Sequence, residues 1–127
     1  MKELILDKSI WRCGEDGGEG HELGAGNTQL CNVEGFQCCL GQFSLQLNKE
    51  LTIDRIKRLG TPYDLGIDLE PLNCAIEVTE GEYYYKDTRL SLEAVKINDD
   101  SQTTVEEKIK LLKELFLKHG YKITVKE

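Results

Sequence analysis

Hydrophobic positions near the end of the chain repeat with the period of a helix. Four of them recur at spacings of three and four residues and share one helical face: Val105, Ile109, Leu112 and Phe116. Thr103 or Thr104, with a glutamate three residues further on, forms a capping box at the start, and Gly120 ends the helix. Residues 121–125 then alternate polar and apolar side chains of high β-propensity. This region predicts a capped helix followed by a terminal strand.

Shorter patterns predict three more helices. In residues 38–47, one helical face collects the apolar side chains of Cys39, Leu40, Phe43 and Leu47. A second, short helix is expected to start near Thr52, whose hydroxyl can cap it. Residues 87–97 predict a third helix capped by Asp87 or Thr88, although the alternation of its apolar residues would also suit a strand.

Strands and loops complete the pattern. We expect strands at residues 28–33 and 74–78, where alternating or β-rich segments are bounded by turn residues. At residues 4–6 a strand is favoured over a first turn of helix, although so few residues show no clear period. The glycine-rich segment 14–26 has the composition of a loop and is expected to be mobile. Residues 61–82, with scattered prolines and glycines, are expected to form a covering loop that holds the strand at 74–78.

The elements together predict one α+β domain over residues 1–127. Its length suits a single hydrophobic core, and the mixed order of elements is neither a βαβ repeat nor a helical bundle. We expect a small, mostly antiparallel sheet of the N-terminal, central and C-terminal strands, packed by the helices. The predicted core residues are Leu4, Leu6, Leu30, Leu40, Phe43, Leu47, Ile56, Ile109, Leu112, Phe116, Ile123 and Val125.

The charge of the chain narrows the range of partners. A formal net charge of −7 and the lack of a basic run argue against binding to a nucleic-acid backbone. The first apolar run, Leu4 to Leu6, is broken by Asp7 and offers no signal-peptide core, and no stretch approaches the roughly 18 apolar residues that span a bilayer. We therefore expect a cytoplasmic protein with no nucleic-acid or membrane partner.

The cysteines are expected to be reduced thiols. The five positions are Cys13, Cys31, Cys38, Cys39 and Cys74, an odd number in a sequence without a signal peptide. With His21, four of them offer the ligand types of a zinc site, but no Cys-x-x-Cys or His-x-x-x-His hook holds two ligands together. Buried structural thiols are favoured, and no metal or cofactor is expected, although metal binding by Cys13, Cys31, Cys38 and Cys39 is left open.

A catalytic set is weakly supported. Cys38 or Cys39 lies at a predicted helix start, where the helix dipole lowers the pKa of a thiol. The histidines are His21, in the glycine-rich segment, and His119, in the last turn of the predicted long helix. Asp99 and Asp100 could bind a cation or act as acid and base, but adjacent carboxylates before a helix more often form caps and turns. Whether the chain is an enzyme stays uncertain, and a binding protein is favoured.

Aromatic and guanidinium groups form the predicted ligand site. Such groups stack a base and clamp a phosphate, although no spacing rule ties these residues together. The candidates are Trp11, Arg12, Arg55, Arg58, Tyr84 and Arg89.

Four segments of the chain resemble a family of short bacteriophage and prophage proteins to which no activity is assigned. They are Ser9-Ile10-Trp11-Arg12-Cys13-Gly14, Gly35-Phe36-Gln37-Cys38-Cys39-Leu40-Gly41, Ile97-Asn98-Asp99-Asp100 and Leu115-Phe116-Leu117-Lys118-His119-Gly120. The resemblance misses mainly residues 59–85. It implies a phage accessory protein in the bacterial cytoplasm and carries no catalytic residues.

The function that we predict is capture of a small nucleotide-like signalling molecule without turnover, as an antagonist of host defence. The alternative is an acidic inhibitor that binds a host protein, and the third possibility is a small enzyme that degrades such a signal. The predicted partner is therefore a small ligand or a host protein, and the sequence leaves open whether the chain forms a homo-oligomer.

Overall fold

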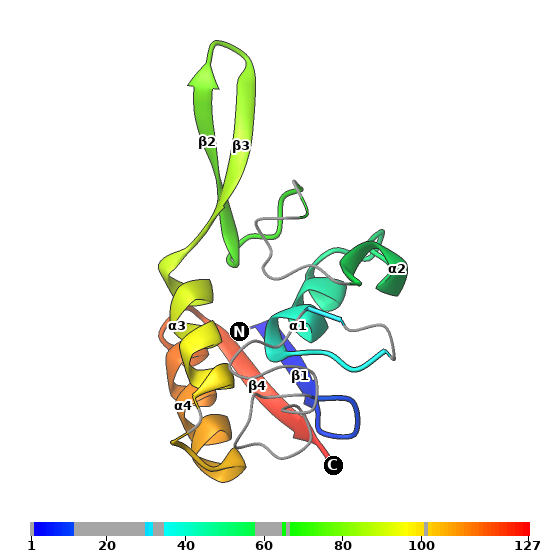
Figure 1. Ribbon diagram of the computed structural model, residues 1–127. Coiled ribbons are helices and arrows are strands. Elements are labelled where there is room, and N and C mark those ends of the chain that lie inside the picture. The colour runs from blue at the N-terminus through cyan, green and yellow to red at the C-terminus, as the bar shows by residue number, and fades with distance from the viewer. Residues whose placement is uncertain (1, 12–29, 32–34, 58–64, 66, 101) are drawn as a thin grey trace.

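The computed structural model describes residues 2–11, 30–31, 35–57, 65, 67–100 and 102–127 (Figure 1). These residues form an α+β domain with four helices. The elements in chain order are β1 (Lys2–Asp7), α1 (Cys39–Leu47), α2 (Ile53–Ile56), β2 (Asn73–Thr79), β3 (Glu82–Asp87), α3 (Arg89–Asp99), α4 (Val105–Leu117) and β4 (Tyr121–Lys126). The glycine-rich segment 14–26 and most of the predicted strand 28–33 lie outside the described residues.

The predicted helices and their threonine caps are confirmed. The hydroxyls of Thr52, Thr88 and Thr104 each accept a hydrogen bond from the backbone N–H three residues further on. At the start of α1 the same position is taken by Cys38, whose Sγ accepts from the Gly41 N–H at 3.4 Å. The helix reading of residues 87–97 is correct because α3 has a strong apolar face and a cap, and the strand alternative is wrong.

The expectation of a mostly antiparallel sheet is wrong. The N-terminal and C-terminal strands form a two-stranded parallel sheet, in which Leu4 lies opposite Ile123 and Leu6 opposite Val125. Strands β2 and β3 form a separate two-stranded antiparallel sheet. The alternation of side chains determines the face that each strand buries, whereas the direction of pairing depends on the whole connection between the strands.

The core lies between the β1–β4 sheet and the helices α1, α3 and α4. Phe43 and Phe116 meet at its centre in an edge-to-face arrangement, with ring centroids 5.1 Å apart. Of the predicted core, the buried members are Leu4, Leu6, Leu30, Leu40, Phe43, Ile56, Leu112, Phe116 and Ile123. Leu47, Ile109 and Val125 are only half-buried, and Leu47 and Ile109 pack against the edge of the buried core.

A glycine allows α1 to approach a distant segment. A Cβ added at Gly41 would lie 1.8 Å from the backbone oxygen of Leu30, so a side chain there would force the two segments apart. Cys31, next to Leu30, forms an isolated parallel bridge with Lys57. The close approach therefore packs residues 30–31 against α1.

The β2–β3 hairpin projects away from the helices and from the β1–β4 sheet (Figure 1). The predicted strand at 74–78 is confirmed within β2, but the partner strand β3 was not predicted and the expected covering loop ends before it. The hairpin turns at Gly81, which has a φ of 80°.

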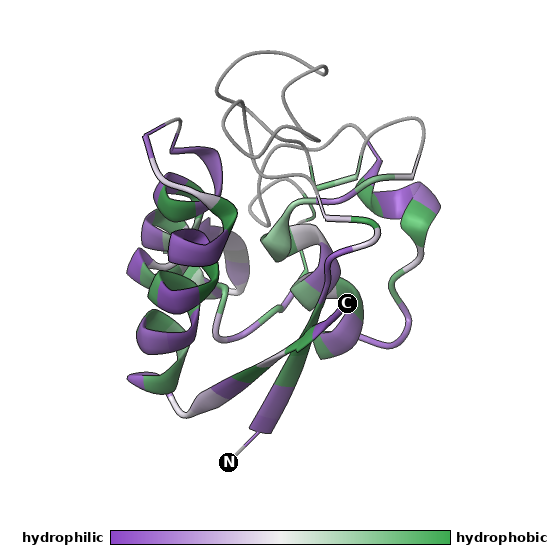
Figure 2. Cartoon of the chain, turned by 90° about the horizontal axis from the view of Figure 1, so that it is seen from below, coloured by the Kyte–Doolittle hydropathy of each residue, from purple (hydrophilic) through white to green (hydrophobic). Residues whose placement is uncertain are grey.

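Figure 2 shows hydrophilic and hydrophobic residues alternating along the helices. Within the described residues, no helix is long and apolar enough to cross a membrane.

Candidate functional site

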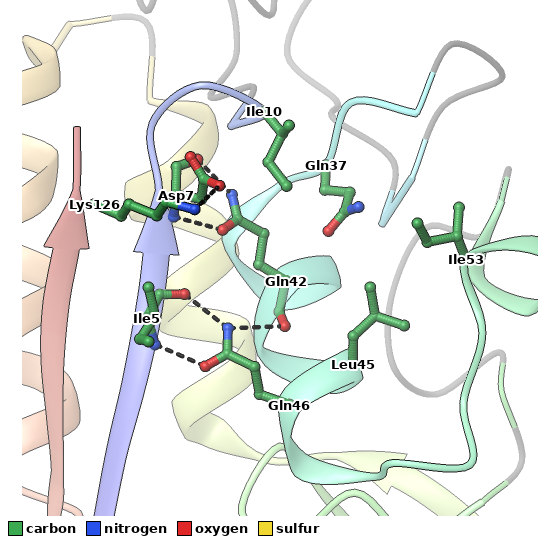
Figure 3. Close-up of a pocket in the computed structure, with 9 residues that line it drawn as sticks. All are labelled: Ile5, Asp7, Ile10, Gln37, Gln42, Leu45, Gln46, Ile53 and Lys126. Carbon is green, nitrogen blue, oxygen red and sulfur yellow. Dashed lines mark hydrogen bonds and ion pairs between the residues drawn. The ribbon is translucent and has the colours of Figure 1, made fainter.

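Two pockets border the elements that carry the predicted chemistry. One lies between β1 and α1 and has a volume of about 390 Å³; we call it the α1–β1 pocket (Figure 3). The other lies at the base of the β2–β3 hairpin, next to the start of α3, and has a volume of about 580 Å³; we call it the hairpin-base pocket. Their side chains suit different roles.

Two glutamines in the α1–β1 pocket bind the free edge of β1. Gln46 accepts from the Ile5 N–H at 2.7 Å through Oε1 and donates to the Ile5 carbonyl at 2.7 Å through Nε2. Gln42 makes the same pair of bonds to Asp7, at 2.7 Å and 3.1 Å (Figure 3). The two amides, one helical turn apart, therefore occupy the positions that peptide groups of a neighbouring strand would fill.

The rest of the α1–β1 pocket is poorly suited to an anion. Its apolar lining includes Ile10, Leu45 and Ile53. Its cation, Lys126, is 3.7 Å from a carboxylate oxygen of Asp7. Hydrogen bonds from Ser9, and then the nearby Lys126, lower the pKa of Asp7, so this carboxylate is ionised at neutral pH and neutralises the lysine.

The hairpin-base pocket collects side chains from three parts of the chain. They come from the loop and strand before the hairpin tip, from β3 and the first turn of α3, and from the residues that follow α4. The lining consists of Asp68, Glu70, Pro71, Asn73, Cys74, Ala75, Tyr85, Thr88, Arg89, Leu90 and His119.

Side-chain hydrogen bonds hold the wall of this pocket in place. Asn73 accepts from the Leu69 N–H and donates to the Ile67 carbonyl, each at 2.7 Å, which folds the loop before β2. Thr88, besides capping α3, donates its hydroxyl to the Pro71 carbonyl at 2.8 Å. The loop and the helix start are therefore joined by bonds that are internal to the wall.

The groups that face this pocket are chemically diverse. Arg89 has a 90% exposed side chain, and its Nε lies 3.4 Å from Glu93, one helical turn further on. Tyr85 adds a half-buried aromatic ring, and His119 adds an imidazole. Asp68 and Glu70 contribute carboxylates to the lining, and the Asp68 carboxylate accepts from the Glu70 N–H at 3.0 Å. A guanidinium, an aromatic ring and two carboxylates can thus contact one ligand.

The predicted ligand residues are not gathered in one place. Arg89 lines the hairpin-base pocket, whereas Arg55 lies on α2 and donates to the Leu65 carbonyl at 3.3 Å. Tyr84 is exposed on β3, and the alternation of the strand directs it to the face opposite Tyr85.

Trp11, another predicted ligand residue, is only 4% exposed. Its indole N–H donates to Asn98 Oδ1 at 2.8 Å, which is a core hydrogen bond. Arg12 and Arg58 lie outside the described residues. The predicted ligand set contained Tyr84 of the tyrosine run at 83–85, whereas the pocket is lined by Tyr85 and by His119, which the set did not include.

The Cys38 thiol at the start of α1 is not an activated nucleophile. Cys38 and Cys39 are buried. Burial is the main cause that raises the pKa of Cys38 to about 12, and the negative charge of Asp99 adds to it. The hydrogen bond from the Gly41 N–H lowers the pKa but does not outweigh burial. The expectation that the helix dipole lowers this pKa is wrong for Cys38, because desolvation is the larger effect. Burial likewise raises the pKa of Cys31.

The remaining candidate groups have structural partners. The Asp100 carboxylate accepts from the Gln102 N–H at 2.8 Å, and the Asp99 carboxylate accepts from the Asn98 side chain at 2.9 Å. His119 lies just beyond the end of α4 rather than in its last turn. In the part of the chain that the structure describes, no three His, Cys, Asp or Glu side chains cluster as a metal site.

In comparisons with protein-family models, with curated proteins and with solved structures, nothing matches this chain. The case for a function therefore depends on the side chains of the hairpin-base pocket.

Proposed function

We propose that the chain binds a small nucleotide-like molecule in the hairpin-base pocket without converting it. One observation carries the proposal: Arg89 and Tyr85 line the same pocket of about 580 Å³. This volume falls within the range of roughly 300–1,000 Å³ that is usual for small-molecule sites. A guanidinium and an aromatic ring are the groups that a phosphate and a base require.

Arg89 is the phosphate-binding group in this proposal. A guanidinium presents paired N–H donors that match two phosphate oxygens, and such charge-assisted bonds are stronger than bonds between neutral groups. Arg89 is also the first residue of α3, where the unpaired backbone N–H groups favour a negative charge. The ring of Tyr85 offers a surface on which a base can stack.

The carboxylates limit the charge of the ligand. Asp68 and Glu70 can accept hydrogen bonds from ribose hydroxyls or from the amino group of a base. They would also repel a chain of phosphates that the single arginine cannot neutralise. The proposed ligand therefore carries one phosphate group, linear or cyclic.

Among the described residues that line the pocket, no nucleophile is paired with a base. Cys74 and His119 both line it, but no hydrogen bond joins their side chains in the described chain. Binding without turnover is the simpler reading, because a thiol needs such a base or a lowered pKa to attack. In a bacteriophage setting, capture of this kind would sequester a signalling molecule of the host cytoplasm.

The first test is native mass spectrometry after incubation with a nucleotide-rich extract, followed by calorimetry with linear and cyclic mononucleotides. We expect an intact ligand at one per chain. Arg89→Ala should weaken binding roughly tenfold to a hundredfold, the usual effect of losing hydrogen bonds to a charged group. The matched control is Arg55→Ala, which removes an arginine outside the pocket and should leave the affinity unchanged.

Two results would contradict this proposal. Equal affinities for Arg89→Ala and the unsubstituted chain would remove the assigned role of the pocket, and a chemically altered ligand would show an enzyme. If no small molecule is retained, the acidic-inhibitor alternative predicts a host protein that is captured at low salt and released at high salt.

A further inference from the structure

The β2–β3 hairpin is a two-stranded ribbon whose base adjoins the start of α3 and the residues after α4. Within the described chain, each of its strands pairs with the other and with no third strand, and the ribbon extends beyond the rest of the molecule (Figure 1). A two-stranded hairpin is at best marginally stable in water unless other structure supports it. Its free edges also present backbone groups to which another strand can bond.

One face of β3 carries an aromatic residue between opposite charges. Glu82, Tyr84 and Lys86 alternate along the strand and therefore point to the same side of the ribbon. Tyr84 is 43% exposed and lies opposite Ile76 of β2. Glu82 and Lys86 are exposed, and neither has an ion-pair partner in the described part of the chain. Both charges are therefore available to pair with groups on another molecule.

We propose that two copies of the chain associate through the free edges of β3, paired antiparallel about a two-fold axis at Tyr84. In this register Tyr84 lies opposite the partner's Tyr84. Glu82 lies opposite the partner's Lys86, and by symmetry Lys86 lies opposite the partner's Glu82. Directly opposed aromatic residues and opposite charges are the pairs that stabilise antiparallel strands. The strand is thus complementary to a second copy of itself.

The charges select both the edge and the register. A two-fold axis perpendicular to the sheet keeps each side chain on its own face, so Tyr84 can oppose only residues of its own face. Centring the pair on Tyr85 would place Lys86 opposite Tyr84 and leave Glu82 beyond the paired strand. The edge of β2 offers no alternative, because Asn73–Thr79 contains Glu77 and no lysine or arginine.

The pairing joins the two hairpins into a four-stranded sheet in the order β2–β3–β3–β2. The paired charges lie on the face of β3 opposite Tyr85, which belongs to the hairpin-base pocket. Cys74, which is paired with Lys86 in the β2–β3 ladder and therefore shares its face, also lines that pocket. This inference does not depend on the proposed function, and either can fail alone.

Sedimentation equilibrium over a concentration series tests the dimer. We expect a monomer–dimer equilibrium for the unsubstituted chain. Glu82→Lys or Lys86→Glu alone sets like charges opposite each other at two symmetric positions and should weaken the dimer roughly tenfold or more. The double variant Glu82→Lys/Lys86→Glu restores opposite charges and should recover most of the affinity. Lys113→Glu, at an exposed position of α4, is the control for net charge.

Disulfide trapping tests the register. In a Cys74→Ser background, Tyr84→Cys places two thiols opposite each other at the axis. Oxidised glutathione should couple them, releasing two reduced glutathione molecules for each inter-chain disulfide. Val78→Cys, at a 61% exposed position on β2, should couple far more slowly. A monomer at every concentration, unchanged affinity in both charge variants, or equal trapping at the two positions would overturn the proposal.

Discussion

At the scale of single residues, the surroundings of Cys38 decide its chemistry. The cysteine was placed correctly at a helix start from the sequence, where a dipole alone would favour the thiolate. The structure adds burial and the nearby Asp99, which come from packing with residues distant along the chain. Sequence can locate a thiol in an element, but the direction of its pKa shift depends on which groups the tertiary fold brings to it.

The raised pKa of Cys38 predicts an alkaline loss of stability. Between the ordinary thiol pKa of 9.0 and the folded value of about 12, the unfolded chain releases a proton that the folded chain retains. The unfolded state then binds fewer protons, so the free energy of unfolding falls as pH rises through this window. Urea unfolding at a series of pH values measures the slope.

Cys38→Ser provides the control for this prediction. A serine hydroxyl does not titrate in this range and can still cap α1. We expect its free energy of unfolding to decline less steeply above pH 9 than that of the unsubstituted chain. Identical slopes for the two proteins would show that the Cys38 thiol does not control the alkaline transition.

At the scale of elements, α1 does more than cover the sheet. Its apolar face was predicted from spacing, and so was its start. The role of Gln42 and Gln46 could not be predicted, because the pattern of a helix does not show which strand lies beside the polar residues of that helix. The amides satisfy backbone groups at an edge that would otherwise be open to pairing.

Each glutamine should protect a different amide. Gln46→Ala should accelerate hydrogen exchange at the Ile5 N–H and leave the Asp7 N–H protected, and Gln42→Ala should do the reverse. The two variants are therefore controls for each other. The cost should be about 1–3 kcal/mol for Gln42, which is buried, and less for the exposed Gln46. Similar exchange at both amides in either variant would contradict the assignment.

Local signals explain which elements were predicted. The helix starts could be predicted because an N-cap hydrogen bond joins residues that are only three positions apart. The caps are Thr52, Thr88 and Thr104. Strand β3 was missed because a run of three tyrosines does not alternate. The segment Thr79 to Glu82, with Gly81 inside, is nevertheless a two-residue hairpin connection between β-rich runs.

At the scale of the whole molecule, Asn98 joins three distant segments. Its Oδ1 accepts from the Trp11 indole N–H at 2.8 Å and from the Cys39 N–H at 3.1 Å. It therefore connects the end of α3, the start of α1 and the residues after β1. A buried amide with such partners cannot be recognised from the sequence, because each of its contacts crosses a long stretch of chain.

Asn98→Ala should destabilise the fold by about 2–4 kcal/mol, because it removes an acceptor for two buried donors. Chemical denaturation measures the loss. Asn48→Ala is the control, since that side chain accepts a single bond, from the exposed Glu50 N–H at 3.0 Å, and its loss should cost under about 0.5 kcal/mol. Equal effects of the two substitutions would show that Asn98 does not hold the segments together.

The candidate site was the least predictable part of the molecule. Arg89 was predicted as a ligand residue from its type alone, and apart from nearby residues such as Tyr85 its neighbours in the pocket come from the loop before β2, from β2 and from the residues after α4. No local pattern links residues so far apart. The direction of the β1–β4 pair was missed for the same reason, because it depends on the path of the whole chain.

The parallel pairing of β1 with β4 has a consequence for synthesis. A ribosome makes β1 before every other described element and β4 after them, so the nascent chain carries β1 without its partner until β4 has left the exit tunnel. Closing such a distant contact is slow, and an unpaired strand edge favours association between incomplete chains. Chaperones that shield emerging strands would therefore act mainly during this interval.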